Sequence, residues 1–149
     1  MTPPAPARPV EVVLVEDNPG DALITEEAFE QAKVAVNLVV CEDGPTAVSH
    51  LESSAGSAGP PMPDLILLDL NLPGMSGLQV LEHIRTHDAI KHIPVIVMTS
   101  STAPEDVLAA YRGHANSFIS KPVRPQEFLD AVKSLESYWL TVVRLPSDR

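Results

Sequence analysis

Hydrophobic and polar positions follow two different periods along the chain. Short, nearly all-apolar runs are typical of strands that are buried on both faces of a sheet. Amphipathic stretches, each with a helix-start signal, follow these runs. The runs that predict strands are Val10–Val15, Val36–Cys41, Leu65–Leu68, Val95–Met98 and Ser117–Ile119. A strand-then-helix order repeated five times predicts an α/β fold, with a doubly wound five-stranded parallel sheet and helices on both faces.

Capping residues predict where the helices begin. Ser76 and Gln79 have the spacing of a capping box, and so do Thr102 and Glu105. Prolines stand near the other helix starts, where a missing N–H costs nothing. The expected helices run from Asn18 to about Ala32, from Asp43 to about Ser53, from Ser76 to about His87, from Thr102 to about Gly113, and from Pro125 to about Ser137.

The remaining segments divide the chain into three parts. Residues 1–9 are rich in Pro and Ala and are expected to form a disordered N-terminal arm. Residues 10–137 are expected to form one domain, and residues 138–149 a C-terminal extension. Inside the domain, Ser53–Pro63 is rich in Ser, Ala, Gly and Pro and predicts a flexible loop.

Composition narrows the class of protein. Twenty acidic against ten basic residues leave a formal net charge of −10, which disfavours binding to nucleic acid. No apolar run approaches the ~20 residues that a membrane-spanning helix needs. The N-terminus lacks the apolar core of a signal peptide, so we expect a cytoplasmic protein. The single cysteine, Cys41, lies in an apolar run and is expected to be a small buried side chain.

The candidate chemistry lies where the predicted strands end. Glu16 and Asp17 follow the first strand, Asp69 the third and Thr99 the fourth, while Lys121 follows the fifth. In doubly wound sheets the ligand crevice lies beyond these carboxyl ends. Two like charges ~4 Å apart repel by about 1 kcal/mol in water and by about 4 kcal/mol at a dielectric of ~20, so three gathered acids need a cation. All-oxygen ligands favour Mg²⁺, and Mn²⁺ could substitute.

Other interpretations of these residues are weaker. A single strand-end acid would more often cap a helix or lie in solvent. A phosphatase with an Asp nucleophile would want a second Asp two residues after Asp69, where Asn71 stands. No Gly-x-x-x-x-Gly-Lys-Ser/Thr loop is present to bind a nucleotide. His83 and His87 have the i, i+4 spacing of a helical metal pair, but the sequence supplies no third ligand.

Four segments together resemble the receiver domain of two-component response regulators. They are Val12–Asn18, Leu65–Gly77, Ile93–Ser100 and Ser120–Pro122. The resemblance covers nearly the whole chain from Val10 to about Ser137 and implies a flavodoxin-like sheet. It also implies a stand-alone phosphoryl-accepting switch rather than an enzyme, with a sensor histidine kinase as the partner.

The resemblance implies a role for each matching residue. Asp69 would be the phosphoryl acceptor, and Glu16 and Asp17 the acidic pair at the metal. Asn71 would lend its backbone carbonyl to the metal. The residues that would sense the phosphoryl group or respond to it are Thr99, Ser100, Lys121 and Phe118, and the Lys121–Pro122 bond would be cis. From the sequence pattern alone, Phe118 would be a plain core aromatic.

The C-terminal extension is unusually apolar for a chain end. Its dimer candidates are Tyr138, Trp139, Leu140, Val142, Val143 and Leu145. Such a segment either packs back on its own domain or pairs with a second subunit. It resembles the tail of small response regulators that partner phytochrome-type histidine kinases, which implies a homodimer and a bacteriophytochrome as the kinase. We expect no effector domain after Arg149, so output would be by protein contact or by passing the phosphoryl group onward.

Overall fold

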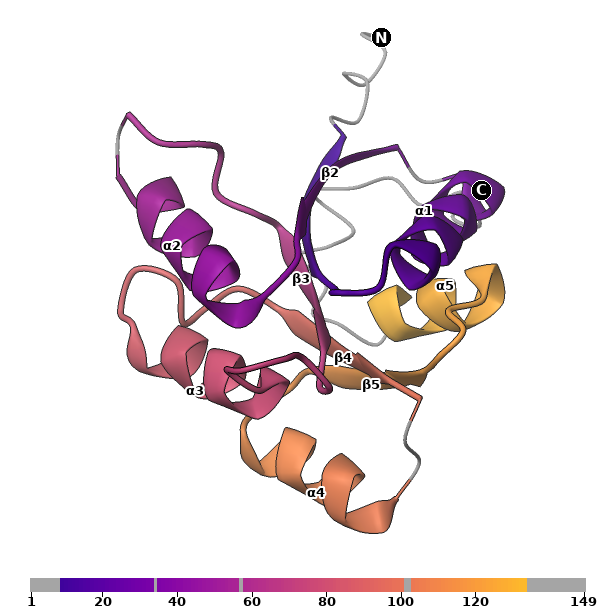
Figure 1. The fold of residues 1–149 in the computed structure, drawn as a ribbon. Coiled ribbons are helices and arrows are strands. Elements are labelled where there is room, and N and C mark those ends of the chain that lie inside the picture. Colours follow the sequence, from indigo (N-terminus) through magenta and orange to yellow (C-terminus); the bar gives the residue numbers. More distant parts are fainter. Residues whose placement is uncertain (1–8, 34, 57, 101–102, 134–149) are drawn as a thin grey trace, which may run out of the picture.

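Five parallel strands form the centre of the molecule in the order β2-β1-β3-β4-β5 (Figure 1). The computed structural model describes residues 9–33, 35–56, 58–100 and 103–133. The strands are β1 (Val10–Val15), β2 (Val36–Cys41), β3 (Leu65–Asp69), β4 (Val95–Thr99) and β5 (Ser117–Ser120). The predicted α/β fold with a doubly wound parallel sheet is therefore confirmed. Because the order reverses at β1, the crevice beyond β1 and β3 is where a ligand site is expected.

Helices cover both faces of this sheet. They are α1 (Pro19–Ala32), α2 (Gly44–Ser54), α3 (Gly77–Thr86), α4 (Pro104–Arg112) and α5 (Pro125–Lys133). Helices α1 and α5 pack against each other on one face, and α2 and α3 on the other, beside α4 (Figure 1). The predicted end of the last helix, near Ser137, lies outside the described residues.

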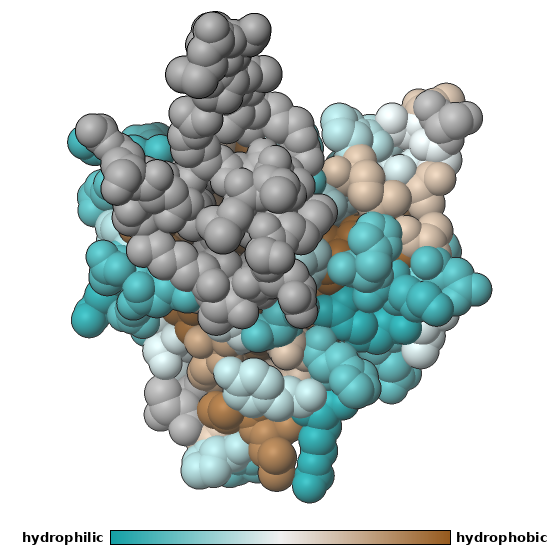
Figure 2. All heavy atoms as spheres, turned by 180° about the vertical axis from the view of Figure 1, so that it is seen from behind, coloured by the Kyte–Doolittle hydropathy of each residue, from teal (hydrophilic) through white to brown (hydrophobic). Residues whose placement is uncertain are grey.

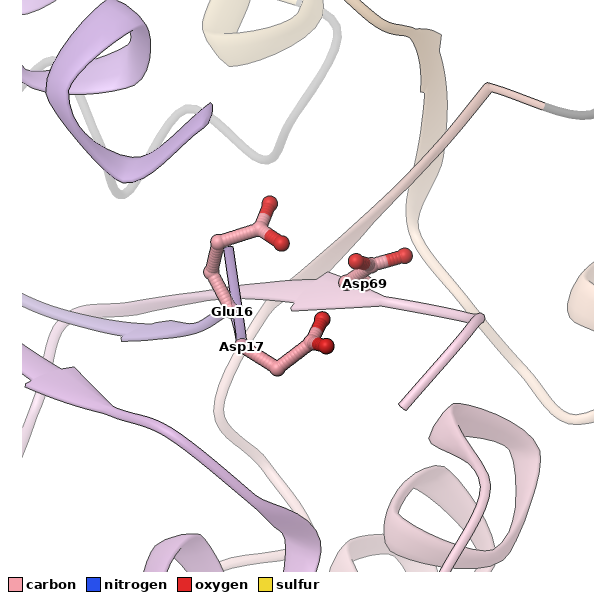
Figure 3. Close-up of side chains that lie close together, drawn as sticks. All are labelled: Glu16, Asp17 and Asp69. Carbon is pink, nitrogen blue, oxygen red and sulfur yellow. The ribbon is translucent and has the colours of Figure 1, made fainter. Parts of the chain in front are cut away.

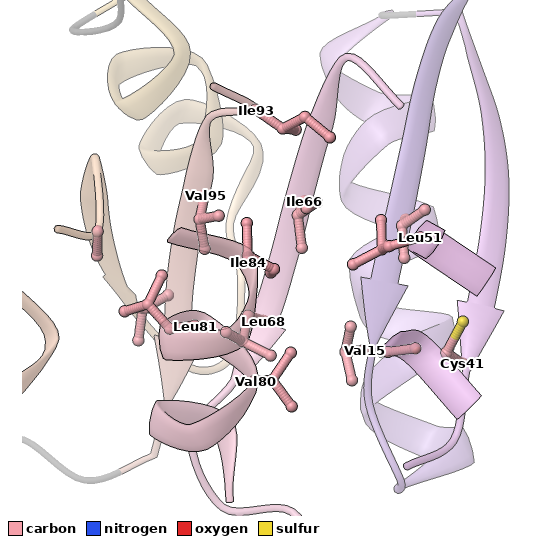
Figure 4. Packing of buried hydrophobic residues seen from close by; sticks show 14 of the residues in the cluster. Val15, Cys41, Leu51, Ile66, Leu68, Val80, Leu81, Ile84, Ile93 and Val95 are labelled. Carbon is pink, nitrogen blue, oxygen red and sulfur yellow. The ribbon is translucent and has the colours of Figure 1, made fainter. Parts of the chain in front are cut away.

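Alternate side chains of each strand supply the two halves of the core. On one face Phe29 of α1 and Phe128 of α5 meet edge to face, with ring centroids 4.5 Å apart. On the other face Leu51 of α2 and Ile84 of α3 belong to a second buried cluster, in which Ile84 lies beside β3 and Leu51 beside β1 (Figure 4). Cys41 is buried in this second cluster with a free thiol, as the sequence predicts. A sheet held from both sides gives its strand ends little freedom.

Three of the predicted helix starts are confirmed by their capping hydrogen bonds. The side chains of Asn18 and Asp43 each accept a backbone N–H from the first turn of α1 and α2. Both halves of the capping box of Ser76 and Gln79 are present at α3.

The predicted capping box of Thr102 and Glu105 is wrong. Helix α4 has Ala103 at its N-cap, with no side-chain hydrogen bond there. Its start is instead favoured by Pro104, which presets the first helical φ, and by two acids in the first turn. Thr102 itself lies outside the described residues.

The described helices include none that is long and apolar enough to span a membrane. The surface carries both hydrophilic and hydrophobic residues. Figure 2, a view from behind, shows hydrophobic residues low on the molecule, at the height of α4. Among the described residues, the large exposed apolar side chains are Leu23, Ile24, Val39, Val40, Leu108 and Tyr111. The expected N-terminal arm and the apolar C-terminal extension fall almost entirely outside the described residues.

Candidate functional site

Three carboxylates converge at the carboxyl edge of the sheet. Glu16 and Asp17 directly follow β1, and Asp69 is the last residue of β3, paired in register with β4. One oxygen from each lies within 4.8 Å of the other two, and Figure 3 shows the side chains gathered around a common space. Glu16 and Asp69 are buried, whereas Asp17 is exposed. The strand-end acids that the sequence singled out are thus brought together.

Lys121 is the cation of this site. It follows β5, and its bond to Pro122 is cis, as expected. Its Nζ lies 2.8 Å from Asp69 Oδ2 and 2.6 Å from Glu16 Oε1. Both contacts are ion pairs, and the one to Asp69 is also a hydrogen bond. One lysine therefore faces an excess of negative charge.

This excess changes the acidity of the groups in it. The pKa of Glu16 is raised to about 7: burial is the largest cause, the contact with Lys121 opposes the rise, and nearby Asp69 adds to it. Burial would lower the pKa of Lys121, but its bonds and charge attraction to Asp69 and Glu16 hold it above the ordinary lysine value. Glu16 is thus a buried acid that holds its proton more strongly than an ordinary glutamate.

Asn71 and Thr99 form a second set of contacts beside Asp69. The Asn71 backbone N–H donates to Asp69 Oδ1 at 2.9 Å, and its side-chain Nδ2 donates to Thr99 Oγ1 at 3.1 Å. Thr99 is fully buried at the end of β4. The side-chain link between Asn71 and Thr99 is a contact that the sequence did not predict, and the expected use of the Asn71 carbonyl stays a prediction.

Gly77 lets the chain return closely past Asp69. A Cβ at this position would lie 2.3 Å from the Asp69 carbonyl oxygen and 2.6 Å from the Cα of Leu70. Both are backbone atoms that cannot move aside cheaply. The first residue of α3 must therefore be glycine if the β3–α3 turn is to pack against the backbone of Asp69.

Asp21 is a member of the site that the sequence analysis missed. It stands in the first turn of α1, and its Oδ2 lies 3.2 Å from Lys121 Nζ. Its side chain is 39% exposed. The only signal in the sequence was an acid four residues after Asp17, which is also an ordinary first-turn residue of a helix.

The remaining predicted residues lie further out. Ser100 is exposed, and Phe118 is half-buried against the cluster that α2 and α3 cover. His83 pairs across the helices with Glu52, Nε2 to Oε2 at 3.1 Å, and its ring lies 6.0 Å from that of His87. Within the part of the chain that the structure describes, only Glu16, Asp17 and Asp69 form a group able to hold a metal ion.

Comparison with known proteins identifies this arrangement. The response regulator receiver domain family matches residues 12–133. The chain belongs to this family. Response regulator Rcp1 of Synechocystis sp. is 35% identical over 139 residues, which cover 93% of this chain and 95% of Rcp1. The receiver family's members are signalling switches rather than conventional enzymes, and an acidic trio of this kind is typical of their metal site.

Solved structures show the same fold. The bacteriophytochrome response regulator AtBRR is 37% identical, with a TM-score of 0.75, over 86% of this chain and 93% of its own. The phosphorylated cyanobacterial phytochrome response regulator RcpA is 36% identical, with a TM-score of 0.73, over 94% and 100% of the two chains. The Mn²⁺-bound form of Rcp1 gives a TM-score of 0.70 at 35% identity, over 93% and 100%.

Proposed function

We propose that this receiver domain accepts a phosphoryl group on Asp69 from the phosphohistidine of a sensor histidine kinase. The observation that carries the proposal is the surrounding of Asp69. Its carboxylate is buried, held on one side by Lys121 and on the other by the Asn71 N–H, and faces Glu16 and Asp17. RcpA, a relative with the same fold, is known in a phosphorylated form.

Glu16, Asp17 and Asp69 would hold Mg²⁺, and the donor set fits this ion. All three donors are carboxylate oxygens, which Mg²⁺ prefers, and Mn²⁺ accepts the same ligands. Three carboxylates meet a single ammonium group here, so Lys121 alone does not neutralise the site. The backbone carbonyl of Asn71 would add a fourth protein ligand. A bound Mg²⁺ would offset the charge of the acids and of the incoming phosphoryl group.

The transfer itself needs position and charge more than covalent help. A carboxylate oxygen of Asp69 bonds to phosphorus as the P–N bond of phosphohistidine breaks, and the electron pair of that bond stays on the imidazole nitrogen. The Lys121 ammonium binds one phosphoryl oxygen. The Thr99 hydroxyl donates to another as Thr99 moves toward the phosphoryl group.

That movement would couple the site to the surface. Thr99 is buried at the end of β4, and Phe118 is half-buried on the neighbouring strand β5. When Thr99 moves toward the phosphoryl group, space opens for Phe118 to turn inward, and Ser100 moves with its neighbour. The faces of α4, β5 and α5 then change for protein partners. A shift from 1:99 to 99:1 would need ~5.5 kcal/mol, so we expect a partial one.

Phosphoryl labelling tests the proposal directly. With acetyl phosphate and Mg²⁺ we expect the intact protein to gain one phosphoryl group by mass spectrometry, and Asp69→Asn to gain none. Chelation of Mg²⁺ should abolish the gain in the wild type. Labelling of Asp69→Asn to the wild-type level would show that another residue is the acceptor.

We also propose a pathway and an assembly. Similarity to Rcp1, RcpA and AtBRR supports a cytoplasmic phytochrome-type pathway with a bacteriophytochrome as the kinase. Residues 10–137 would be the receiver domain and residues 138–149 a dimer contact. Light scattering on a chain truncated after Ser137 should give about half the mass of the full-length dimer. An unchanged dimer mass would exclude the extension as the contact.

A further inference from the structure

Lys121 is shared among acids from three different parts of the chain. Its Nζ contacts Glu16 after β1, Asp69 at the end of β3 and Asp21 in the first turn of α1, at 2.6, 2.8 and 3.2 Å. An ammonium group has three protons to donate. In the unphosphorylated protein each of them therefore has a carboxylate to face.

The three acids differ in what else they do. Glu16 and Asp69 belong to the group that would hold the metal, but Asp21 does not. Asp21 is also the most open of the three, with 39% of its side chain exposed, against 0% for Glu16 and 4% for Asp69. If the contact with Lys121 breaks, water can solvate the exposed Asp21 carboxylate at little cost in free energy. A buried carboxylate would be left without a partner.

We infer that Asp21 is a positioning residue for Lys121, which draws the ammonium partly away from Asp69 and adds negative charge at the edge of the acidic site. The inference rests on the proposed phosphoryl-accepting function. It has two consequences of opposite sign. Asp21 strengthens the binding of a cation, because it adds charge and competes for Lys121. It weakens the binding of a phosphoryl group, because its negative charge repels that group and its contact with Lys121 competes with the phosphoryl oxygen for the ammonium.

A merely structural role would act differently. An acid in the first turn stabilises a helix, and its loss would lower the stability of the protein and weaken both kinds of binding together. The capping contact at this turn uses the Asp21 backbone, whose N–H donates to Asn18 Oδ1, so Asp21→Asn leaves it intact. Opposite changes in the two affinities therefore separate positioning from folding.

The experiment titrates Asp21→Asn and wild type with Mg²⁺ by calorimetry, and then with beryllium trifluoride, a phosphoryl analogue, by ¹⁹F NMR at saturating Mg²⁺. We expect Asp21→Asn to bind Mg²⁺ about fivefold more weakly, an effect sized for a partly exposed charge, and to bind the analogue more tightly. Asp21→Glu should stay near the wild type in both. Glu30→Gln, the same charge change at an exposed position at the far end of α1, is the matched control.

The outcomes separate the two proposals. If wild type binds both probes and Asp21→Asn matches it, or if both affinities of the variant fall together, the positioning role is wrong and the proposed function stands. If Glu30→Gln reproduces the effect, net charge and not Asp21 is responsible. If the wild type binds neither probe, the proposed function fails and this inference fails with it.

Discussion

Two half-buried cations stand at opposite ends of the sheet in opposite surroundings. At the carboxyl ends of the strands Lys121 faces three carboxylates within 3.2 Å. At the amino ends of β4 and β5, Arg85 of α3 donates only to neutral oxygens. Its acceptors are the carbonyls of Lys91, Ile93 and His114 and the side-chain oxygen of Asn116.

The contrast separates a structural cation from a functional one. Four hydrogen bonds tie the guanidinium of Arg85 to neutral acceptors, and burial lowers its pKa. Lys121 stands among four acids, Glu16, Asp17, Asp21 and Asp69, and its own pKa is raised. Such an excess of acids lowers the stability of the protein unless a cation binds among them. The surroundings of Lys121 are therefore those of a binding site, whereas the contacts of Arg85 are structural.

The largest effect on stability should come from the loss of Arg85, at the amino ends of β4 and β5. Arg85→Met leaves several acceptors without a donor and should lower the free energy of unfolding by about 3 kcal/mol, measured by urea denaturation. Mg²⁺ affinity should not change, because the other end of the sheet is untouched. Arg124→Met is the control, since Arg124 is 72% exposed and only weakly paired with Glu127. A shift in Mg²⁺ affinity on loss of Arg85 would undo the separation of the two ends.

The surroundings of Lys121 and Arg85 also differ in how much of them the sequence could predict. The strand ends were predictable, because apolar runs end visibly and Glu16, Asp69 and Lys121 stand directly after them. The Asp21 contact was not, because it joins residues 100 positions apart, one in the first turn of α1 and the other just after β5. The Arg85 cluster was not either, since most of its acceptors are backbone carbonyls, which every residue carries.

The acidic end should show itself in the pH dependence of stability without metal. The folded protein keeps the Glu16 proton to about pH 7, whereas an ordinary glutamate releases it near 4.5. The folded state therefore binds more protons between these values. The free energy of unfolding falls as the pH rises from about 4.5 to about 7, by at most about 1.4 kcal/mol per pH unit, and levels off above that range. Lys121 stays charged throughout and adds no slope there.

Glu16→Gln tests the assignment of this pH dependence. The variant carries no titrating group at this position and should lose most of the slope between pH 5 and 7.5, as measured by urea denaturation in a chelator. Saturating Mg²⁺ should flatten the wild-type curve as well, because a bound cation favours the charged carboxylate. A slope that persists unchanged in Glu16→Gln would assign it to another group.

The smallest effect on stability should come from Asp17→Asn, which removes only repulsion among the carboxylates. Asp17 is exposed and belongs to the acidic trio, but the structure gives it no ion pair that its loss would break. Asp17→Asn should therefore stabilise the metal-free protein by about 0.5–1 kcal/mol, while the added stability that Mg²⁺ gives the wild type is lost. Asp88→Asn is the matched control, because Asp88 is exposed and pairs only with Lys91. It should change neither quantity measurably. If Asp17→Asn were less stable than the wild type without metal, the negative charges around Lys121 would already be neutralised. The surroundings of Lys121 and Arg85 would then differ only in whether the acceptors are charged, and not in an excess of negative charge.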